Sequence, residues 1–215
     1  MRRVHRTLWS LVAALSLLTG ATCRALVEPE APDFVEYGWE LLEAAEDAGE
    51  FRAALEQFKA GVGSAQGGDP EFADGWNGQG WTYAKLGVAD SSDLLFTTAI
   101  TKEADSVVAT ERLAGRSFAN LAQGEFSEAV TDAKNALLLI PNWEFRRLQV
   151  NSVPTITYAH ITLTAATGFY GLGEFDSCLV WIRKLDATFS ANVTTLAGRS
   201  RLGEKLKSLT SGLIP

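Results

Sequence analysis

Residue types that usually carry chemistry are scarce in this chain of 215 residues. It contains two cysteines, two histidines and one methionine. A metal site needs several His, Cys or carboxylate ligands close together, and the sequence has neither a zinc-type Cys pair nor such a cluster. It also lacks a Gly-rich phosphate-binding loop and the G-x-S-x-G motif of serine hydrolases. We therefore expect no cofactor, no metal ion and no enzymatic activity.

Positive charge is scarce beyond the first residues. Without Arg2, Arg3 and Arg6, 16 basic side chains remain against 26 acidic ones, a formal charge of −10. Such a surface repels phosphate backbones and anionic lipid heads. Nucleic acid is therefore not an expected partner.

The chain also lacks a hydrophobic run that spans a bilayer. The apolar run at residues 8–18 has 11 residues, whereas a transmembrane helix needs about 20. A basic start precedes this run and small residues follow it, which is the order of a signal peptide. We predict a signal peptide over 1–25, a short linker over 26–32, and an exported protein of the periplasm or cell envelope.

Cys23 stands at the end of the small-residue stretch of this leader. Its place resembles the lipobox of bacterial lipoproteins, in which the Cys becomes the lipidated N-terminus. Gly20 and Thr22 depart from that pattern, which prefers Leu and then Gly or Ala at their positions. Lipidation of Cys23 would anchor the protein to a membrane. Ordinary cleavage after Ala21 or Ala25 is the competing interpretation.

The most informative feature that is present is a repeated tripeptide. Gly-Glu-Phe occurs at 49–51, 124–126 and 173–175, each time after an Ala-rich segment, and a small residue stands three positions after each Phe. Gly suits the turn that ends a helix, and an acidic residue suits the start of the next helix. A small residue lets two helices approach closely. The pattern predicts a helical hairpin that is repeated along the chain.

One segment matches a known repeat pattern. In residues 76–83, Trp, Gly and Tyr follow the W-x2-L-G-x2-Y spacing of the first tetratricopeptide helix, with Gln79 where the pattern has Leu. Ser92 and Phe96 then stand in the A-x3-F positions of the second helix. The chain therefore resembles the tetratricopeptide repeat (TPR) family. In the same register, Cys178 takes the place of a packed Ala, so we expect it to be buried and unreactive.

Turn spacing locates the main departure from the family. The expected turns at Gly49, Gly87, Gly124 and Gly173 are 38, 37 and 49 residues apart, against a repeat of about 34. The last interval therefore carries an insert at 142–154, whose notable residues are Trp143, Phe145, Arg146, Arg147 and Leu148. Two placements remain open for it: a loop across the groove, or an extension before the fourth repeat.

The resemblance implies an all-α fold, a right-handed α-solenoid of about four TPR-like helical hairpins with a C-terminal capping helix and no sheet. Within a repeat region of 33–192, the repeats are expected at about 33–70, 72–106, 107–141 and 153–190. The amphipathic stretch 193–215 supplies the capping helix and tail.

In the TPR family the first helices of the hairpins line a concave groove. Carried over by register, this gives as candidate contacts Glu36, Trp39, Glu43, Asn77, Trp81, Lys85, Phe118, Leu121, His160, Leu163 and Tyr170. Packing between repeats is the other role open to the aromatic residues, and capping or solvation to His160. The basic residues that family members use to clamp a C-terminal carboxylate are missing, with only Lys85 near.

Two functions follow from this reading. The first is an exported, non-catalytic scaffold that binds a protein or peptide in the groove. The alternative is a small-ligand or envelope-glycan binding module that uses exposed Trp side chains as stacking platforms. The two differ in whether Trp39 and Trp81 face an open groove or a closed pocket.

Overall fold

The computed structural model describes residues 31–64, 70–102, 106–150 and 153–213, and most of them are helical. The predicted signal peptide, including Cys23, lies outside these residues.

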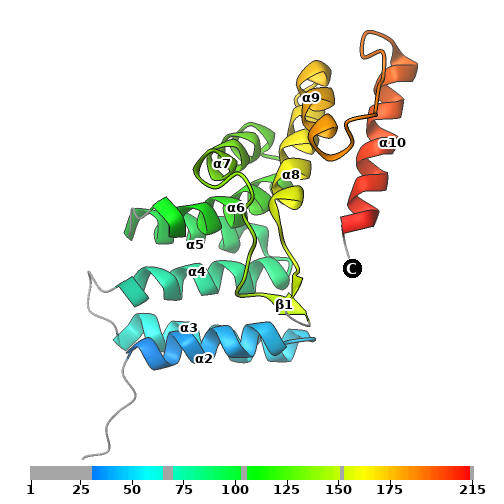
Figure 1. Ribbon diagram of the computed structural model, residues 1–215. Helices are drawn as coiled ribbons and strands as arrows, with labels where there is room; N and C mark the ends of the chain where they lie inside the picture. The colour runs from blue at the N-terminus through cyan, green and yellow to red at the C-terminus, as the bar shows by residue number, and fades with distance from the viewer. Residues whose placement is uncertain (1–30, 65–69, 103–105, 151–152, 214–215) are drawn as a thin grey trace, which may run out of the picture. The chain divides into compact units, whose positions relative to one another are not determined.

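Consecutive helices of the described chain pair into hairpins that stack in sequence order (Figure 1). The pairs are α2 (Ala31–Ala44) with α3 (Ala48–Ser64), α4 (Pro70–Lys85) with α5 (Ala89–Lys102), α6 (Ser106–Gln123) with α7 (Phe126–Leu139), and α8 (Tyr158–Gly171) with α9 (Phe175–Leu185). Each hairpin packs on the next, and α10 (Leu196–Leu213) packs on α8 and α9. The predicted solenoid of about four hairpins with a capping helix is confirmed.

Turns between paired helices follow the repeated tripeptide in two of its three copies. Gly124 and Gly173 have φ of +80° and +76°, a left-handed conformation that costs little without a Cβ. The next residues, Glu125 and Glu174, are the N-caps of α7 and α9. Glycine and glutamate therefore occupy the predicted places.

The first copy behaves differently, and the prediction that Gly49 ends a helix is wrong. Gly49 lies in the first turn of α3. The Asp47 carboxylate accepts hydrogen bonds from the backbone N–H groups of Gly49 and Glu50, at 2.7 and 3.0 Å. The Glu50 carboxylate accepts in return from the Asp47 N–H at 3.3 Å. A capping aspartate, rather than a left-handed glycine, therefore starts this helix.

Phenylalanine side chains of the second helices fill slots between helices. Phe58 of α3 and Phe96 of α5 are fully buried. A Cβ on Gly78 of α4 would overlap the Phe58 ring, and one on Gly80 would lie 2.8 Å from the Phe96 ring. The two glycines therefore let α4 approach both rings closely, which is why this helix tolerates residues of poor helix propensity.

Cys178 occupies an equivalent interior position in α9. Its side chain is fully buried in a cluster with Ile182 and Leu202. Burial raises the pKa of the thiol to about 12, so the thiol stays protonated at neutral pH. The predicted burial of this cysteine is confirmed, and its low reactivity remains a prediction that the raised pKa supports.

The connection between α7 and α8 departs from helical structure. Strand β1 (Gln149–Val150) pairs antiparallel with β2 (Val153–Pro154), and Glu144 forms an isolated bridge with Thr157. We call residues 143–150 and 153–157 the ribbon. The expectation of a fold with no sheet is wrong here, because the two arms of this segment satisfy backbone groups by pairing with each other.

Candidate functional site

The first helices of the four hairpins, α2, α4, α6 and α8, form what we call the inner face. The ribbon lies against the first three of them. Figure 1 shows it running from α7 and α8 down to β1, beside α2 and α4. Its Phe145 ring stacks on Trp81 of α4 with centroids 4.4 Å apart, and meets Trp39 of α2 edge-on at 6.0 Å. Trp143 stacks on the other side of Phe145 at 5.6 Å. Of the two placements open to the insert, the structure adopts the loop across the groove.

These contacts bury the aromatic side chains on both sides. Phe145 is 0% exposed, Trp143 6%, Trp39 5% and Trp81 2%. The expectation that Trp39 and Trp81 are exposed is therefore wrong, and packing is the role that they adopt. Helix periodicity places them on the correct face, but it does not reveal that a distant segment covers that face.

A polar cluster lies beside the aromatic stack. The Arg147 guanidinium bonds the Asp74 carboxylate at 2.9 Å, lies 3.9 Å from the Glu111 carboxylate, and sits 4.7 Å from the centroid of the Trp39 ring. Trp39 Nε1 donates to Asp74 at 3.0 Å, and Asn77 Nδ2 donates to Glu111 at 2.5 Å. Two carboxylates and one indole face therefore surround a single arginine. We call this group the arginine socket.

Glu111 is the titratable residue of this socket. Its side chain is 14% exposed, and burial, opposed by Arg147, raises the pKa of its carboxyl to about 7. Asp74, close by, favours the same neutral form, and the Asn77 amide opposes it. The socket therefore changes its charge near neutral pH.

Sequence reasoning missed Asp74 and Glu111 as members of this site, although a signal existed. Each stands seven residues before a predicted groove residue, Trp81 and Phe118 respectively. Residues seven apart lie on the same face of a helix. Burying an acidic residue on the face that packs inward costs free energy unless a cation pairs with it. Such a residue therefore indicates a cationic partner.

Beyond the ribbon, the inner face is open. A hollow of about 430 Å³ lies between α6, α8 and α10. We call it the apolar pocket, and it is lined by Phe118, Leu121, Ile156, His160, Leu163, Thr164, Thr167, Thr210 and Leu213. Four of the residues expected on the groove, Phe118, Leu121, His160 and Leu163, thus come together here.

His160 uses both ring nitrogens inside the protein. Nδ1 accepts a hydrogen bond from the Thr157 backbone N–H at 3.1 Å, which completes a capping box at the start of α8. Nδ1 therefore carries no proton, and Nε2–H donates to the Leu213 carbonyl of α10 at 3.0 Å. The capping role is confirmed. The imidazole offers the pocket only its apolar surface.

Comparison with known proteins rests on structure alone, because no family model and no curated protein matches this chain. A thermophilic TPR protein from Thermus thermophilus aligns over 85% of this chain and 82% of its own, with a TM-score of 0.51 and 16% identity. A TPR protein from Parabacteroides merdae aligns over 85% of this chain and 60% of its own, with a TM-score of 0.55 and 13% identity. A double mutant of MamA RS-1 aligns over 86% and 97%, with a TM-score of 0.57 and 12% identity.

The fold is a TPR fold. Its inner face holds the predicted site residues in separate places. Asn77 is buried in the arginine socket, whereas Glu36, Glu43 and Lys85 are exposed. Tyr170 packs on the Phe175 ring at 5.5 Å, outside the lining of the apolar pocket.

A different hollow, of about 330 Å³, lies between α5, α6 and α7. Arg116 bonds both Asp132 oxygens at 2.8 Å there, and Asn120 donates to the same carboxylate at 3.2 Å. The Arg116 guanidinium and the Asp132 carboxylate thus neutralise each other where they are partly buried. We interpret them as a structural ion pair between neighbouring helices.

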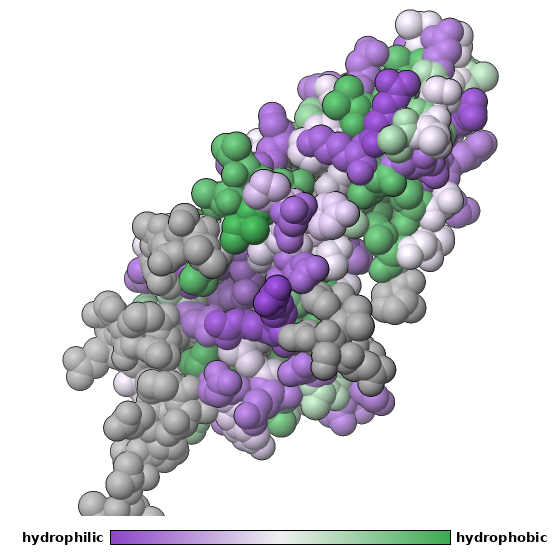
Figure 2. All heavy atoms as spheres, in the orientation of Figure 1, coloured by the Kyte–Doolittle hydropathy of each residue, from purple (hydrophilic) through white to green (hydrophobic). Residues whose placement is uncertain are grey.

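The residues that the structure describes contain no group of three or more His, Cys, Asp or Glu side chains placed to hold a metal ion. None of the described helices combines the length and hydrophobicity needed to cross a membrane. Figure 2 shows a largely hydrophilic surface, on which hydrophobic residues gather in patches near α7 and α10.

Proposed function

We propose that this protein is an exported, non-catalytic scaffold that binds a protein partner through the apolar pocket. The observation that carries this proposal is an open hollow of about 430 Å³ on the inner face, between α6, α8 and α10. TPR folds serve in general as protein-interaction scaffolds, and their inner helices are the usual contact surface. Phe118, Leu121 and Leu163 supply the apolar walls.

The chemistry of the lining defines the part of the partner that would enter. Its wall is mainly apolar, with hydroxyls from Thr164, Thr167 and Thr210. Thr164 already donates to the His160 carbonyl at 3.0 Å, and Thr210 to the Leu206 carbonyl at 3.0 Å. A partner would therefore bury a few apolar side chains and find little free hydrogen-bonding capacity.

The glycan alternative loses its structural basis. Stacking of a sugar ring requires an open indole face, and Trp39 and Trp81 are 5% and 2% exposed. Neither residue lines the apolar pocket. We therefore keep a protein partner as the proposal.

A filled-pocket variant tests this function. Thr167→Phe places a ring in the pocket from the part of its wall that α8 forms. Thr131→Phe places the same ring at an exposed position of α7 and serves as the matched control. We expect the first variant to lose partner capture from envelope extracts by at least about tenfold, since hot-spot pockets contribute about 2 kcal/mol or more. Equal capture by both variants and the unaltered protein would refute the pocket assignment.

Export belongs to the same proposal and rests on the order of charged, apolar and small residues at 1–25. Mass spectrometry of the mature N-terminus tests it. An acylated Cys23 would establish an anchored lipoprotein, because two or more acyl chains hold a protein stably at a membrane. An unmodified start at Thr22 or Leu26 would establish a soluble exported form. Retention of residues 1–25 would contradict export.

A further inference from the structure

The ribbon contacts the inner face through side chains. Two of its backbone hydrogen bonds among described residues are internal: Phe145 N–H to Ile156 O at 2.9 Å, and Thr155 N–H to Leu148 O at 3.1 Å. A third joins it to α8, because Tyr158, the first residue of that helix, donates its N–H to Trp143 O at 2.7 Å. None of these bonds reaches α2, α4 or α6. The ribbon can therefore leave the face as a unit without breaking its own backbone pairing.

The side chains that hold the ribbon have the character of ligand groups. The Phe145 ring contacts both Trp39 and Trp81, which come from different hairpins. Arg147 occupies the arginine socket, where it bonds Asp74 of α4 and lies near Glu111 of α6. A planar guanidinium suits carboxylates and an aromatic face together better than an ammonium group does. The surface thus selects an aromatic ring and an arginine.

Two buried polar atoms of residues beneath the ribbon have no hydrogen-bond partner within the described residues. They are Asn77 Oδ1 and Trp81 Nε1. Asn77 is 0% exposed and Trp81 2%. Buried polar groups without partners weaken a packed arrangement. A segment that supplied one donor and one acceptor here would fit this face better than the ribbon does.

We propose that the ribbon is an internal ligand, and that the surface beneath it is a second binding surface. Its occupant from outside would be a protein segment that carries an aromatic residue and, two positions later, an arginine. Trp39 and Trp81 would receive the aromatic ring, and Asp74 and Glu111 would receive the arginine. This surface adjoins the apolar pocket, which the ribbon residue Ile156 helps to line, and it is closed until the ribbon moves away.

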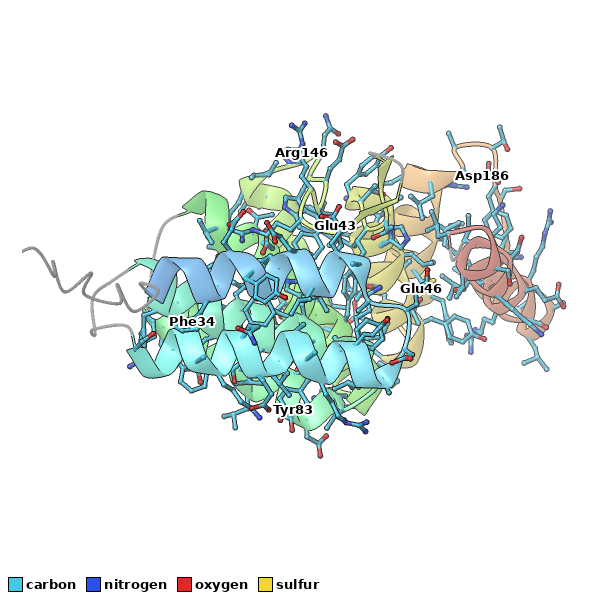
Figure 3. All side chains as sticks on the ribbon, turned by 90° about the horizontal axis from the view of Figure 1, so that it is seen from below. Phe34, Glu43, Glu46, Tyr83, Arg146 and Asp186 are labelled. Carbon is cyan, nitrogen blue, oxygen red and sulfur yellow. The ribbon has the colours of Figure 1, made fainter. Side chains whose placement is uncertain are left out.

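A labelled nine-residue peptide with the sequence of residues 142–150 tests the proposal by fluorescence anisotropy. The unaltered protein should bind it weakly, since its own ribbon competes. Arg147→Ala removes the ion pairs and the indole contact of the ribbon, so the peptide should bind this variant about tenfold more tightly, the equivalent of ~1.4 kcal/mol. Arg146→Ala is the matched control, because the Arg146 side chain is 81% exposed and projects outward (Figure 3).

Further variants and a further peptide test whether the labelled peptide binds at the surface beneath the ribbon. In the Arg147→Ala background, Asp74→Asn should abolish the gain, and a peptide with Ala in place of its Phe and second Arg should not bind. Thr167→Phe should leave peptide binding unchanged, which separates this proposal from the function of the apolar pocket. If Arg147→Ala loses its helical circular dichroism, Arg147→Lys replaces it. We expect this variant to bind the peptide about threefold more tightly than the unaltered protein does, because the lysine ammonium keeps the positive charge but lacks the planar, paired donors of the guanidinium.

Two results would overturn the proposal. One is the same peptide affinity for the unaltered protein and for the folded Arg147 and Arg146 variants. The other is a concentration-dependent dimer of Arg147→Ala in analytical ultracentrifugation, because the ribbon of a second copy would then be the occupant instead of a separate partner.

Discussion

At the scale of single residues, Glu111 makes the stability of the inner face depend on pH. Asp74 and Asn77 of α4, Arg112 of α6 and Arg147 of the ribbon surround its carboxyl. Its pKa in the folded protein is raised from 4.5 to about 7, mainly by burial. Between these two values the folded state binds the proton more tightly than the unfolded state. The contribution of Glu111 to the free energy of unfolding therefore falls as pH rises from 4.5 to 7.

Glu111→Gln should remove this dependence. At pH 4 the variant and the unaltered protein should have similar free energies of unfolding, because Glu111 is then mostly neutral in both the folded and the unfolded state. Above pH 7 the variant should be the more stable by about 1–3 kcal/mol. Urea denaturation from pH 4 to 8 measures the difference, with Glu128→Gln at an exposed position of α7 as control. A difference that stays constant across this range would contradict the explanation.

Gly78 allows α4 to approach Phe58. Gly78→Ala would place a Cβ in overlap with the Phe58 ring, which must then move within a packed core. We expect a loss of about 1–3 kcal/mol in the free energy of unfolding. Gly63→Ala in α3 is the control, since its Cβ would meet nothing within 4 Å; it should gain about 0.5–1 kcal/mol from helix propensity. If the urea midpoints of the Gly78→Ala and Gly63→Ala variants shifted in the same direction, the contact with Phe58 would not determine the change in stability.

At the scale of elements, α10 completes the second hydrophobic cluster. Its Leu202 and Leu206 pack with Ile182 of α9 and Leu163 of α8. Without them, the last hairpin would expose one apolar side to water. An end helix of this kind is what a stacked array requires.

Leu202→Ala should destabilise the last hairpin. The side chain is fully buried, so its truncation should cost about 2–5 kcal/mol. Because α10 packs on α8 and α9, hydrogen exchange should accelerate in α8 to α10 and much less in α2 to α5. Leu196→Ala, at an 83% exposed position of the same helix, provides the comparison. Uniform acceleration along the whole chain would contradict local control by α10.

How far the sequence predicts each element depends on where its contacts lie. The hairpins follow from local signals, since Ser92, Phe96 and Cys178 obey one register and are all buried. The prediction that Gly49 ends a helix is wrong because Asp47, two residues earlier, is the stronger helix-start signal. The sequence left two placements open for the ribbon, because its partners are far away in the sequence and Arg147 has no periodic pattern.

The same limit applies to the candidate site. Phe118 and Leu163 could be placed on the inner face by register, and both line the apolar pocket. Whether Trp39 and Trp81 are open depends on the ribbon, which register does not describe. The binding role of these residues remains a prediction.

At the scale of the whole molecule, the ribbon links hairpins that are not neighbours in the chain. The first hydrophobic cluster includes Trp39, Trp81 and Ala114 from three successive hairpins, together with Phe145 of the ribbon. A plain solenoid has only contacts between successive repeats. The ribbon should therefore make the first three hairpins unfold together.

Phe145→Ala should weaken this coupling. Loss of a fully buried ring should lower the free energy of unfolding by about 3–5 kcal/mol. If the ribbon couples the hairpins, the urea transition should also broaden, with a smaller m-value, because the hairpins then unfold over a range of concentrations. Val180→Ala, at a 57% exposed site on α9, is the control. A lower midpoint with an unchanged m-value would argue that the ring stabilises without coupling.

The bond between Arg147 and Asp74 joins residues 73 positions apart, and this separation has a consequence for the order of folding. Helical hairpins close over short loops and form fast, whereas a contact across so long a segment waits until the intervening chain is ordered. The ribbon should therefore dock late, with φ-values near zero at Phe145 and Arg147. During synthesis, α2, α4 and α6 are complete before the ribbon exists. For that interval the nascent chain presents an uncovered aromatic and acidic surface to whatever surrounds it.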